Sequence, residues 1–159
     1  MSLGAQSALI NAISNCVVDS AVSRQLRAGA DIIRAKQDRG ELREYVVIAL
    51  GTNGTNSYSR YYNEIIEAIN PGHRVIIVTP FDGRSNNNAT AVGNTAVWLR
   101  GLPGQYDYIT IADWNALIST QQELLASDRV HMGGNDARSL YANLIAEAIA
   151  AASRKPAKQ

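Results

Sequence analysis

The sequence predicts an α/β fold, a flavodoxin-like three-layer sandwich with a mostly parallel sheet. Short apolar runs alternate with amphipathic stretches, as in chains that repeat strand and helix. The apolar run at 45–50 is typical of a strand that is covered on both faces, which favours a parallel sheet. One edge of such a sheet would gather the polar and glycine-rich loops, which follow strands or precede the last helix (51–57, 80–88, 113–115 and 127–135).

The individual elements follow from this alternation. Gly40 and the Asn70-Pro71-Gly72 turn are stop signals that end two of the helices. Strands are expected where apolar runs are short and continuous, at 16–19, 45–50, 74–79 and 108–113. Helices are expected where apolar residues recur at helical spacing, at 4–13, 23–38, 58–69, 89–100, 116–126 and from Asn135 or Asp136 onward.

Length and composition indicate one ordinary globular domain. The chain has 159 residues, of which 46% are hydrophobic and 18% charged. We expect residues 1–153 to form the domain and the basic residues 154–159 to form a flexible, solvated tail. A net charge of +1 gives no reason to expect nucleic acid or an anionic membrane as a partner. The chain has no apolar run of about 18 residues, and its N-terminus does not have the pattern of a signal peptide.

Cysteine and histidine are too scarce to suggest a metal site. Cys16 is the only cysteine, so no intrachain disulfide can form, and we expect it to be a small buried hydrophobe. The two histidines, His73 and His131, are far apart in sequence and belong to no cluster of ligands. We therefore expect no metal and no cofactor.

The loop before the last helix carries Asp128-Arg129-Val130-His131. A carboxylate that accepts a hydrogen bond from imidazole Nδ1 fixes the tautomer and leaves Nε2 free as a general base. The unperturbed imidazole titrates at about pH 6.5, close to neutrality. The alternative is that an acidic residue lies three positions before this histidine by chance. His73, in the turn before a strand, has no such partner and is expected to be exposed.

The strand at 45–50 ends in the loop Gly51-Thr52-Asn53-Gly54, which is open to three interpretations. The first interpretation is a plain turn, because Asn and Gly are turn residues. The second is an oxyanion hole, in which Asn53 and nearby backbone N–H groups face a developing negative charge. The third is a phosphate-binding loop, although no Lys-Ser/Thr pair follows it. Trp114, after another strand, either lines the same cleft or packs in the core.

Four short segments of the chain form an ordered set: Val22-Ser23-Arg24-Gln25, Ala49-Leu50-Gly51-Thr52-Asn53-Gly54, Ala112-Asp113-Trp114 and Asp128-Arg129-Val130-His131. In this order they resemble the motifs of the SGNH (GDSL-like) hydrolase superfamily. The closer likeness, over about residues 3–150, is to extracytoplasmic domains fused to membrane acyltransferases, such as peptidoglycan O-acetyltransferases. The resemblance implies that Asp128 and His131 are the acid and base of a Ser-His-Asp triad. It also implies an oxyanion hole formed by Asn53, in the block that begins at Gly51, and by the backbone amide of Ser23, where the superfamily often has glycine.

The nucleophile block is where the chain departs from the family. The family begins with a strand that ends in Gly-Asp-Ser, followed after two residues by a helix start like Leu3-Gly4-Ala5. In this register the serine falls before Met1, and Ser2 is out of register. We therefore expect the first, nucleophile-bearing strand to be missing from the sheet. The resembling fold places it between 16–19 and 45–50. We therefore expect these two strands to pair directly, or a neighbouring chain to supply the missing strand or cover the exposed edges.

The resemblance implies an acyl-transfer domain, either an O-acetyltransferase or an esterase, that acts on cell-surface carbohydrate through an acyl-serine and is inactive in this form. Its expected partners are an acyl donor, a carbohydrate acceptor, the membrane acyltransferase domain of a longer protein at the extracytoplasmic face, and a second copy in a homo-oligomer. Three alternatives stay open. They are a non-catalytic binding domain, a free-standing carbohydrate or lipid esterase, and a flavodoxin-like nucleotide binder. The last predicts ligand at residues 51–56 and no contact between Asp128 and His131.

Overall fold

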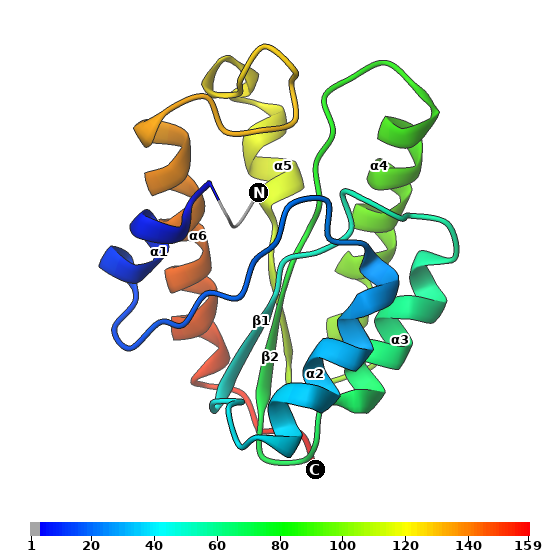
Figure 1. Cartoon of the computed structure of the whole chain (residues 1–159), viewed down its shortest axis with the longest axis vertical. Helices are drawn as coiled ribbons and strands as arrows, with labels where there is room; N and C mark the ends of the chain where they lie inside the picture. Colours follow the sequence, from blue (N-terminus) through cyan, green and yellow to red (C-terminus); the bar gives the residue numbers. More distant parts are fainter. Residues whose placement is uncertain (1–3) are drawn as a thin grey trace.

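A computed structural model describes residues 4–159 and contains a three-stranded parallel sheet with helices on both faces (Figure 1). The strands β1 (Tyr45–Ile48), β2 (Arg74–Val78) and β3 (Ile109–Ala112) lie in the order β1-β2-β3. The predicted α/β sandwich is confirmed, and the strands expected at 45–50, 74–79 and 108–113 are present with ends shortened by one or two residues.

The helices form two layers (Figure 1). One layer covers one face of the sheet with α2 (Gly29–Asp38), α3 (Tyr58–Ala68) and α4 (Asn87–Arg100). The other face carries α1 (Gln6–Ala12), α5 (Trp114–Ser119) and α6 (Asn135–Ala152). Three short 3-10 helices complete the described elements: η1 (Leu26–Ala28), η2 (Leu102–Gly104) and η3 (Gln122–Leu124). None of the helices in residues 4–159 is long and apolar enough to cross a membrane.

The central strand β2 is buried on both faces, as expected for a parallel sheet. Ile76 and Val78 pack in the core on the α6 side. Val75 and Ile77 pack in the core beneath α2, α3 and α4. Two hydrophobic layers therefore hold the sheet and fix the positions at which its strands end.

Two predicted helices differ from the observed ones. The helix expected at 23–38 begins only at η1, because Ser23 has a φ of +55°, which a right-handed helix does not accommodate. The helix expected at 116–126 ends at Ser119 and is followed by η3. Leu125 beyond it forms an antiparallel bridge with Met132, and this pairing requires a non-helical backbone.

The strand predicted at 16–19 is wrong. This segment has irregular backbone, and in the described part of the chain no backbone hydrogen bond joins it to β1. Ion pairs from Asp19 to Arg24 and Lys36 hold the segment instead, at 2.7 and 2.9 Å. The expected direct pairing of 16–19 with β1 is therefore not observed, and cover by a neighbouring chain stays a prediction. Cys16 is half-buried against the α6-side core.

The tail lies at the amino ends of the strands, at the foot of Figure 1. Lys158 Nζ donates to the backbone oxygen of Ile66 at 2.7 Å, and the Lys158 backbone N–H donates to His73 O at 2.8 Å. Residues 154–159, expected to be solvated, are thus hydrogen-bonded to the domain. His73 is half-buried rather than exposed, and its Nδ1 lies 2.7 Å from the backbone oxygen of Arg43.

Candidate active site

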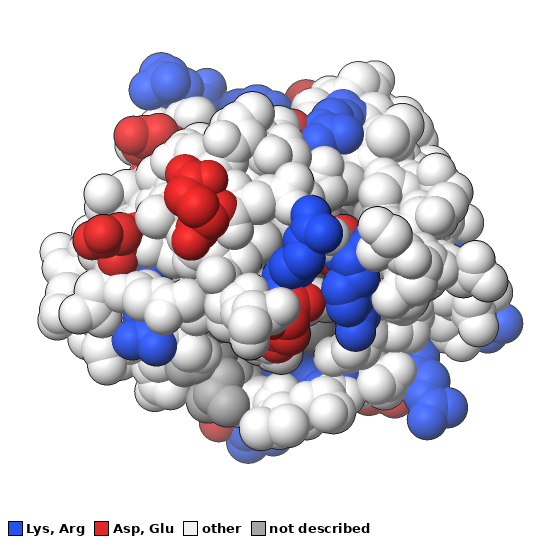
Figure 2. Space-filling view, turned by 90° about the horizontal axis from the view of Figure 1, so that it is seen from above, with Lys and Arg blue, Asp and Glu red and all other residues white. Residues whose placement is uncertain are grey.

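A cavity of about 420 Å³ opens at the carboxyl ends of the strands. Its walls are the loops that follow β1 and β2, the segment before η1 and the loop before α6. Figure 2 shows this face of the molecule, on which basic and acidic side chains lie close together around a hollow near the middle. The cavity is lined by every site residue that the sequence suggested: Ser23, Gly51, Asn53, Asp128 and His131.

Asp128 and His131 form a close pair. Asp128 Oδ2 lies 2.6 Å from His131 Nδ1, and Asp128 Oδ1 accepts the backbone N–H groups of Val130 and His131 at 2.9 and 3.0 Å. The backbone N–H of His131, followed by its imidazole, lowers the pKa of Asp128 well below the usual range. The carboxylate therefore stays ionised and orients the ring. In the described part of the chain, Nε2 has no hydrogen-bond partner.

The loop that carries this pair is held by backbone contacts. Ala126 N donates to His131 O at 2.8 Å, and Gly133 N donates to Leu124 O at 2.9 Å, on either side of the Leu125–Met132 bridge. A Cβ on Gly133 would lie 2.9 Å from backbone atoms of Leu125, so the close approach requires glycine. Although His131 is exposed, the backbone beneath it is fixed.

The loop after β1 presents Asn53 to the cavity. Gly51 has a φ of +103°, and a Cβ there would lie 2.6 Å from the hydroxyl of Tyr62, which donates to Leu50 O at 2.8 Å. Leu26 N donates to Asn53 O at 3.2 Å and fixes the Asn53 backbone. Among residues 4–159 the Asn53 side-chain amide has no partner, so it is available to a ligand.

Ser23 has left-handed backbone, which glycine adopts most easily. This conformation accounts physically for the glycine that the resembling superfamily often has at this position. Gln25 Nε2 donates to Ser23 O at 2.9 Å and holds the turn. The backbone N–H of Ser23 is not hydrogen-bonded within the described residues.

An Asp82–Arg84 pair is the part of the site that sequence reasoning missed. Arg84 lines the cavity, and its guanidinium donates to Asp82 through Nε at 2.9 Å and Nη2 at 2.6 Å. The Asp82 side chain is fully buried and also accepts Asn88 Nδ2 at 2.7 Å. The available signal was an acid two residues before an arginine in a polar loop after a strand, which alone is weak.

Trp114 packs in the core and does not line this cavity. Its side chain is fully buried and meets the Tyr141 ring edge-on at a centroid distance of 5.0 Å. The neighbouring Asp113 caps α5 through Ala116 N and binds the Arg100 guanidinium through both carboxylate oxygens. This segment therefore has a structural role in the part of the chain that the structure describes.

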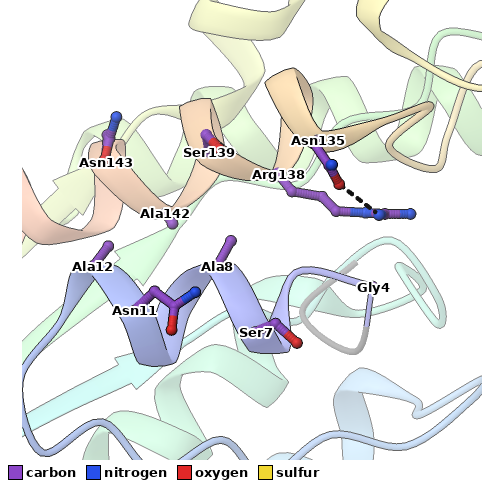
Figure 3. Close-up of a pocket in the computed structure, with 10 residues that line it drawn as sticks. All are labelled: Gly4, Ser7, Ala8, Asn11, Ala12, Asn135, Arg138, Ser139, Ala142 and Asn143. Carbon is purple, nitrogen blue, oxygen red and sulfur yellow. Dashed lines mark hydrogen bonds between the residues drawn. The ribbon is translucent and has the colours of Figure 1, made fainter.

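A second hollow of about 600 Å³ lies between α1 and α6 (Figure 3). Ala8, Ala12 and Ala142 face it, and the dashed line in Figure 3 marks the bond from Arg138 Nη1 to Asn135 Oδ1, 3.1 Å long. No carboxylate or imidazole from residues 4–159 lines this hollow, so acid–base chemistry belongs to the first cavity. The described residues also contain no group of three or more His, Cys, Asp or Glu side chains arranged to hold a metal ion.

Comparison with known proteins relates the chain to cell-wall enzymes. No protein-family profile matches the sequence. The structure is similar to the C-terminal catalytic domain of Streptococcus pneumoniae peptidoglycan O-acetyltransferase A, solved with a methylsulfonyl adduct. The identity is 32% and the TM-score 0.94, and the match covers 99% of this chain and 92% of that one. The sequence is 25% identical over 145 residues, 90% of this chain, to the candidate peptidoglycan O-acetyltransferase YrhL of Bacillus subtilis (strain 168), and it spans about a fifth (22%) of that protein's length.

Two more distant structures share the fold. The α/β hydrolase LAE5, from the metagenome of Lake Arreo, Spain, is 15% identical with a TM-score of 0.64 and is matched over 95% of this chain and 79% of its own. A catalytic mutant of the acetylxylan esterase Axe2 from Geobacillus stearothermophilus is 14% identical with a TM-score of 0.61, over 92% of this chain and 77% of its own. At these identities the likeness shows the fold alone.

Proposed function

Because the chain belongs to the SGNH-type family of peptidoglycan O-acetyltransferase C-terminal catalytic domains, we propose that it carries out acyl transfer on a cell-surface carbohydrate. The observation that carries the proposal is the 2.6 Å contact between Asp128 and His131 Nδ1. It leaves Nε2 without a partner among residues 4–159, in a cavity that also contains the Asn53 amide, which is likewise unpaired within those residues. A flavodoxin-like nucleotide binder was predicted to have no such contact, so this alternative is not favoured.

The chemistry that the pair supports is serine ester exchange. His131 Nε2 would take the proton of a serine hydroxyl while the serine oxygen attacks the acyl carbonyl of the donor. The amide of Asn53 and the N–H of Ser23 would donate to the oxyanion. Collapse would release the donor alcohol, which takes the proton from His131, and leave an acyl-serine. A sugar hydroxyl would then lose its proton to His131 and attack the acyl carbonyl, and the serine oxygen would leave and take that proton back from His131.

We infer further that the nucleophile is not among residues 4–159. The serine and threonine residues that line the cavity are Ser20, Ser23, Thr52 and Thr79, and the hydroxyl of none of these four hydrogen-bonds to His131 Nε2. Thr79 is committed elsewhere, since its hydroxyl donates to Asp113 and accepts Asn115 N. In this proposal the described residues supply base, acid and oxyanion donors, and the serine lies outside residues 4–159.

The proposed setting is the outer face of a cell membrane. In a longer protein, a membrane domain would deliver the acyl group, and this domain would pass it to a sugar hydroxyl. The names of the Streptococcus pneumoniae and Bacillus subtilis relatives support a carbohydrate acceptor in the cell wall.

Turnover of an activated acetyl ester, together with labelling by a serine-directed phosphonate, tests the proposal. The chain as it stands should show neither a burst nor labelling. A chain extended at its N-terminus by a strand that ends in Gly-Asp-Ser should show both, and His131→Ala in that chain should lower kcat by about 10⁴-fold or more. Robust hydrolysis by the unextended chain would place the nucleophile within it. A folded, extended chain without turnover would contradict the acyl-transfer function.

A further inference from the structure

Arg84 is held in place by a buried carboxylate beside the candidate active site. Its Nε donates to Asp82 Oδ1 at 2.9 Å and its Nη2 donates to Asp82 Oδ2 at 2.6 Å, so one edge of the guanidinium lies flat against the carboxylate. The Arg84 backbone N–H adds a third bond to Oδ1 at 3.1 Å. Asp82 has a side-chain exposure of 0%, whereas Arg84 retains 45%. The carboxylate of the pair is therefore buried in the protein, whereas the guanidinium is accessible from solvent.

The Asp82 carboxylate is fully committed to this task. The Arg84 guanidinium lowers its pKa, with a further contribution from the Asn88 amide, so it stays ionised although it is buried. A buried charge without its partners would be strongly unfavourable. The Arg84 guanidinium therefore cannot turn away without leaving the buried Asp82 charge without the cation that pairs with it.

A backbone hydrogen bond fixes Arg84 relative to the Asp128–His131 pair. Gly83 N, next to Arg84, donates to the backbone oxygen of Arg129, next to Asp128, at 2.9 Å. A Cβ on Gly83 would lie 2.9 Å from that oxygen, so the two loops approach as closely as glycine permits. The hydrogen bond to Asp82 is the main cause of the raised pKa of Arg84, and Asp128 is near enough to add to it. The guanidinium thus lies at a set position in the cavity that contains His131.

The outer edge of the guanidinium is unused by the part of the chain that the structure describes. Nη1 has no partner within residues 4–159, and Nη2 has a second N–H beyond the one that binds Asp82. These two nitrogens form a planar fork whose spacing matches the two oxygens of a carboxylate. Asp128, which lines the same cavity, is occupied by His131 and by two backbone N–H groups, so it does not compete for the fork.

We propose that Arg84 determines acceptor specificity by binding a carboxylate on the glycan that receives the acyl group. The inference rests on the acyl-transfer function proposed above and adds the class of acceptor, an acidic glycan instead of a neutral one. Arg84 takes no part in bond making. It holds the sugar so that one hydroxyl lies near His131 Nε2.

Binding measured by NMR titration of the chain as it stands tests this inference. The probes are a tetrasaccharide of alternating N-acetylglucosamine and N-acetylmuramic acid, with free lactyl carboxylates, and the same tetrasaccharide with these carboxylates converted to amides. The wild-type chain should bind the acidic probe about tenfold more tightly than the amidated one, because the charge-assisted fork is lost with the carboxylate. Arg84→Gln should remove this preference and leave the affinity for the amidated probe within about twofold.

Two further variants separate recognition from folding. Arg84→Lys keeps a cation beside Asp82 but has no planar fork, so most of the preference should be lost while the domain stays folded. Arg60→Gln is the matched control, because Arg60 is an exposed arginine that pairs with Glu64 away from the cavity, and it should keep the full preference. Equal affinity of the wild-type chain for the two probes, or binding of neither, overturns the inference without any variant. Because no turnover is measured, that result leaves the ester assay as the separate test of acyl transfer.

Discussion

The two histidines lie at opposite ends of the sheet, and their surroundings differ in a way that separates structure from function. His73 Nδ1 contacts a backbone oxygen, that of Arg43, at 2.7 Å. His131 Nδ1 contacts a carboxylate, that of Asp128, at 2.6 Å. A neutral carbonyl fixes a ring in place, whereas a carboxylate also stabilises the imidazolium that forms when the ring accepts a proton. Only His131 has the partner that a general base needs.

The polar groups at the two ends of the sheet differ in the same way as the two histidines. At the amino ends of the strands, Lys155 and Lys158 donate to backbone oxygens of a strand and a helix, so the charged groups there have partners within the fold. At the carboxyl end, the Asn53 amide and the outer edge of Arg84 have no partner within the described residues. Polar side chains with matched partners stabilise the fold, and those that are held in place yet have unused donors mark the site.

The largest expected difference between the two histidines appears when the carboxylate beside His131 is neutralised. In the chain extended by a Gly-Asp-Ser strand, Asp128→Asn should lower kcat for an activated acetyl ester by about 10⁴-fold, because an amide favours the wrong tautomer. His73→Ala in the same chain should change kcat by less than about threefold, since His73 is not among the residues that line the cavity. Equal losses in the two variants would show that the two histidines do not differ in role.

The second prediction concerns the free amide of Asn53. Asn53→Ala in the extended chain should lower kcat by about 10²- to 10³-fold, because the developing oxyanion loses a donor. KM should change little, since the donor acts mainly in the transition state. Asn56→Ala is the matched control, because Asn56 is exposed in the same loop and does not line the cavity. A rise in KM with kcat unchanged would assign Asn53 to substrate binding instead.

Much of this arrangement could be predicted from the sequence, because the signals are local. The strand at Tyr45–Ile48 is a continuous apolar run, and the spacing of Asp128 and His131 allows a contact within a single turn. The strand predicted at 16–19 failed because an apolar run does not reveal whether a partner strand is available. Val17 in that segment is 67% exposed, which is unusual for a residue of a paired inner strand.

The Asp82–Arg84 pair could not be predicted in this way. Its significance rests on the complete burial of the Asp82 side chain, which depends on how the loop after β2 packs. The sequence shows only an acid and a base two residues apart in a polar loop, a pattern that is usually solvated. Similarly, nothing local indicates that Gly83 approaches the backbone of Arg129.

A third prediction concerns the glycine at which the site loop begins. Gly51→Ala should lower the free energy of unfolding by about 2–3 kcal/mol, combining left-handed strain with the clash against the Tyr62 hydroxyl. Gly40→Ala isolates the strain, because Gly40 also has positive φ but no atom within 4 Å of the added Cβ, and it should cost about 1 kcal/mol. Urea unfolding of both variants measures the difference. Equal values would mean that the loop relaxes around the new methyl group.

The smallest expected effect is the contribution of Asp128 to stability in acid. The backbone N–H of His131, the imidazole and the N–H of Val130 all favour the carboxylate, so the pKa of Asp128 is lower in the folded protein than in the unfolded chain. The unfolded chain therefore binds the proton first as pH falls, and the stabilisation present above about pH 4 is lost progressively below it. Because the Asp128 side chain is 47% exposed, solvent screening keeps the effect small. Asp128→Asn should slightly flatten the fall in unfolding free energy between about pH 4 and pH 2. Urea unfolding at several pH values measures this, and parallel curves for variant and wild type would show that the bonds to Asp128 orient His131 without stabilising the fold.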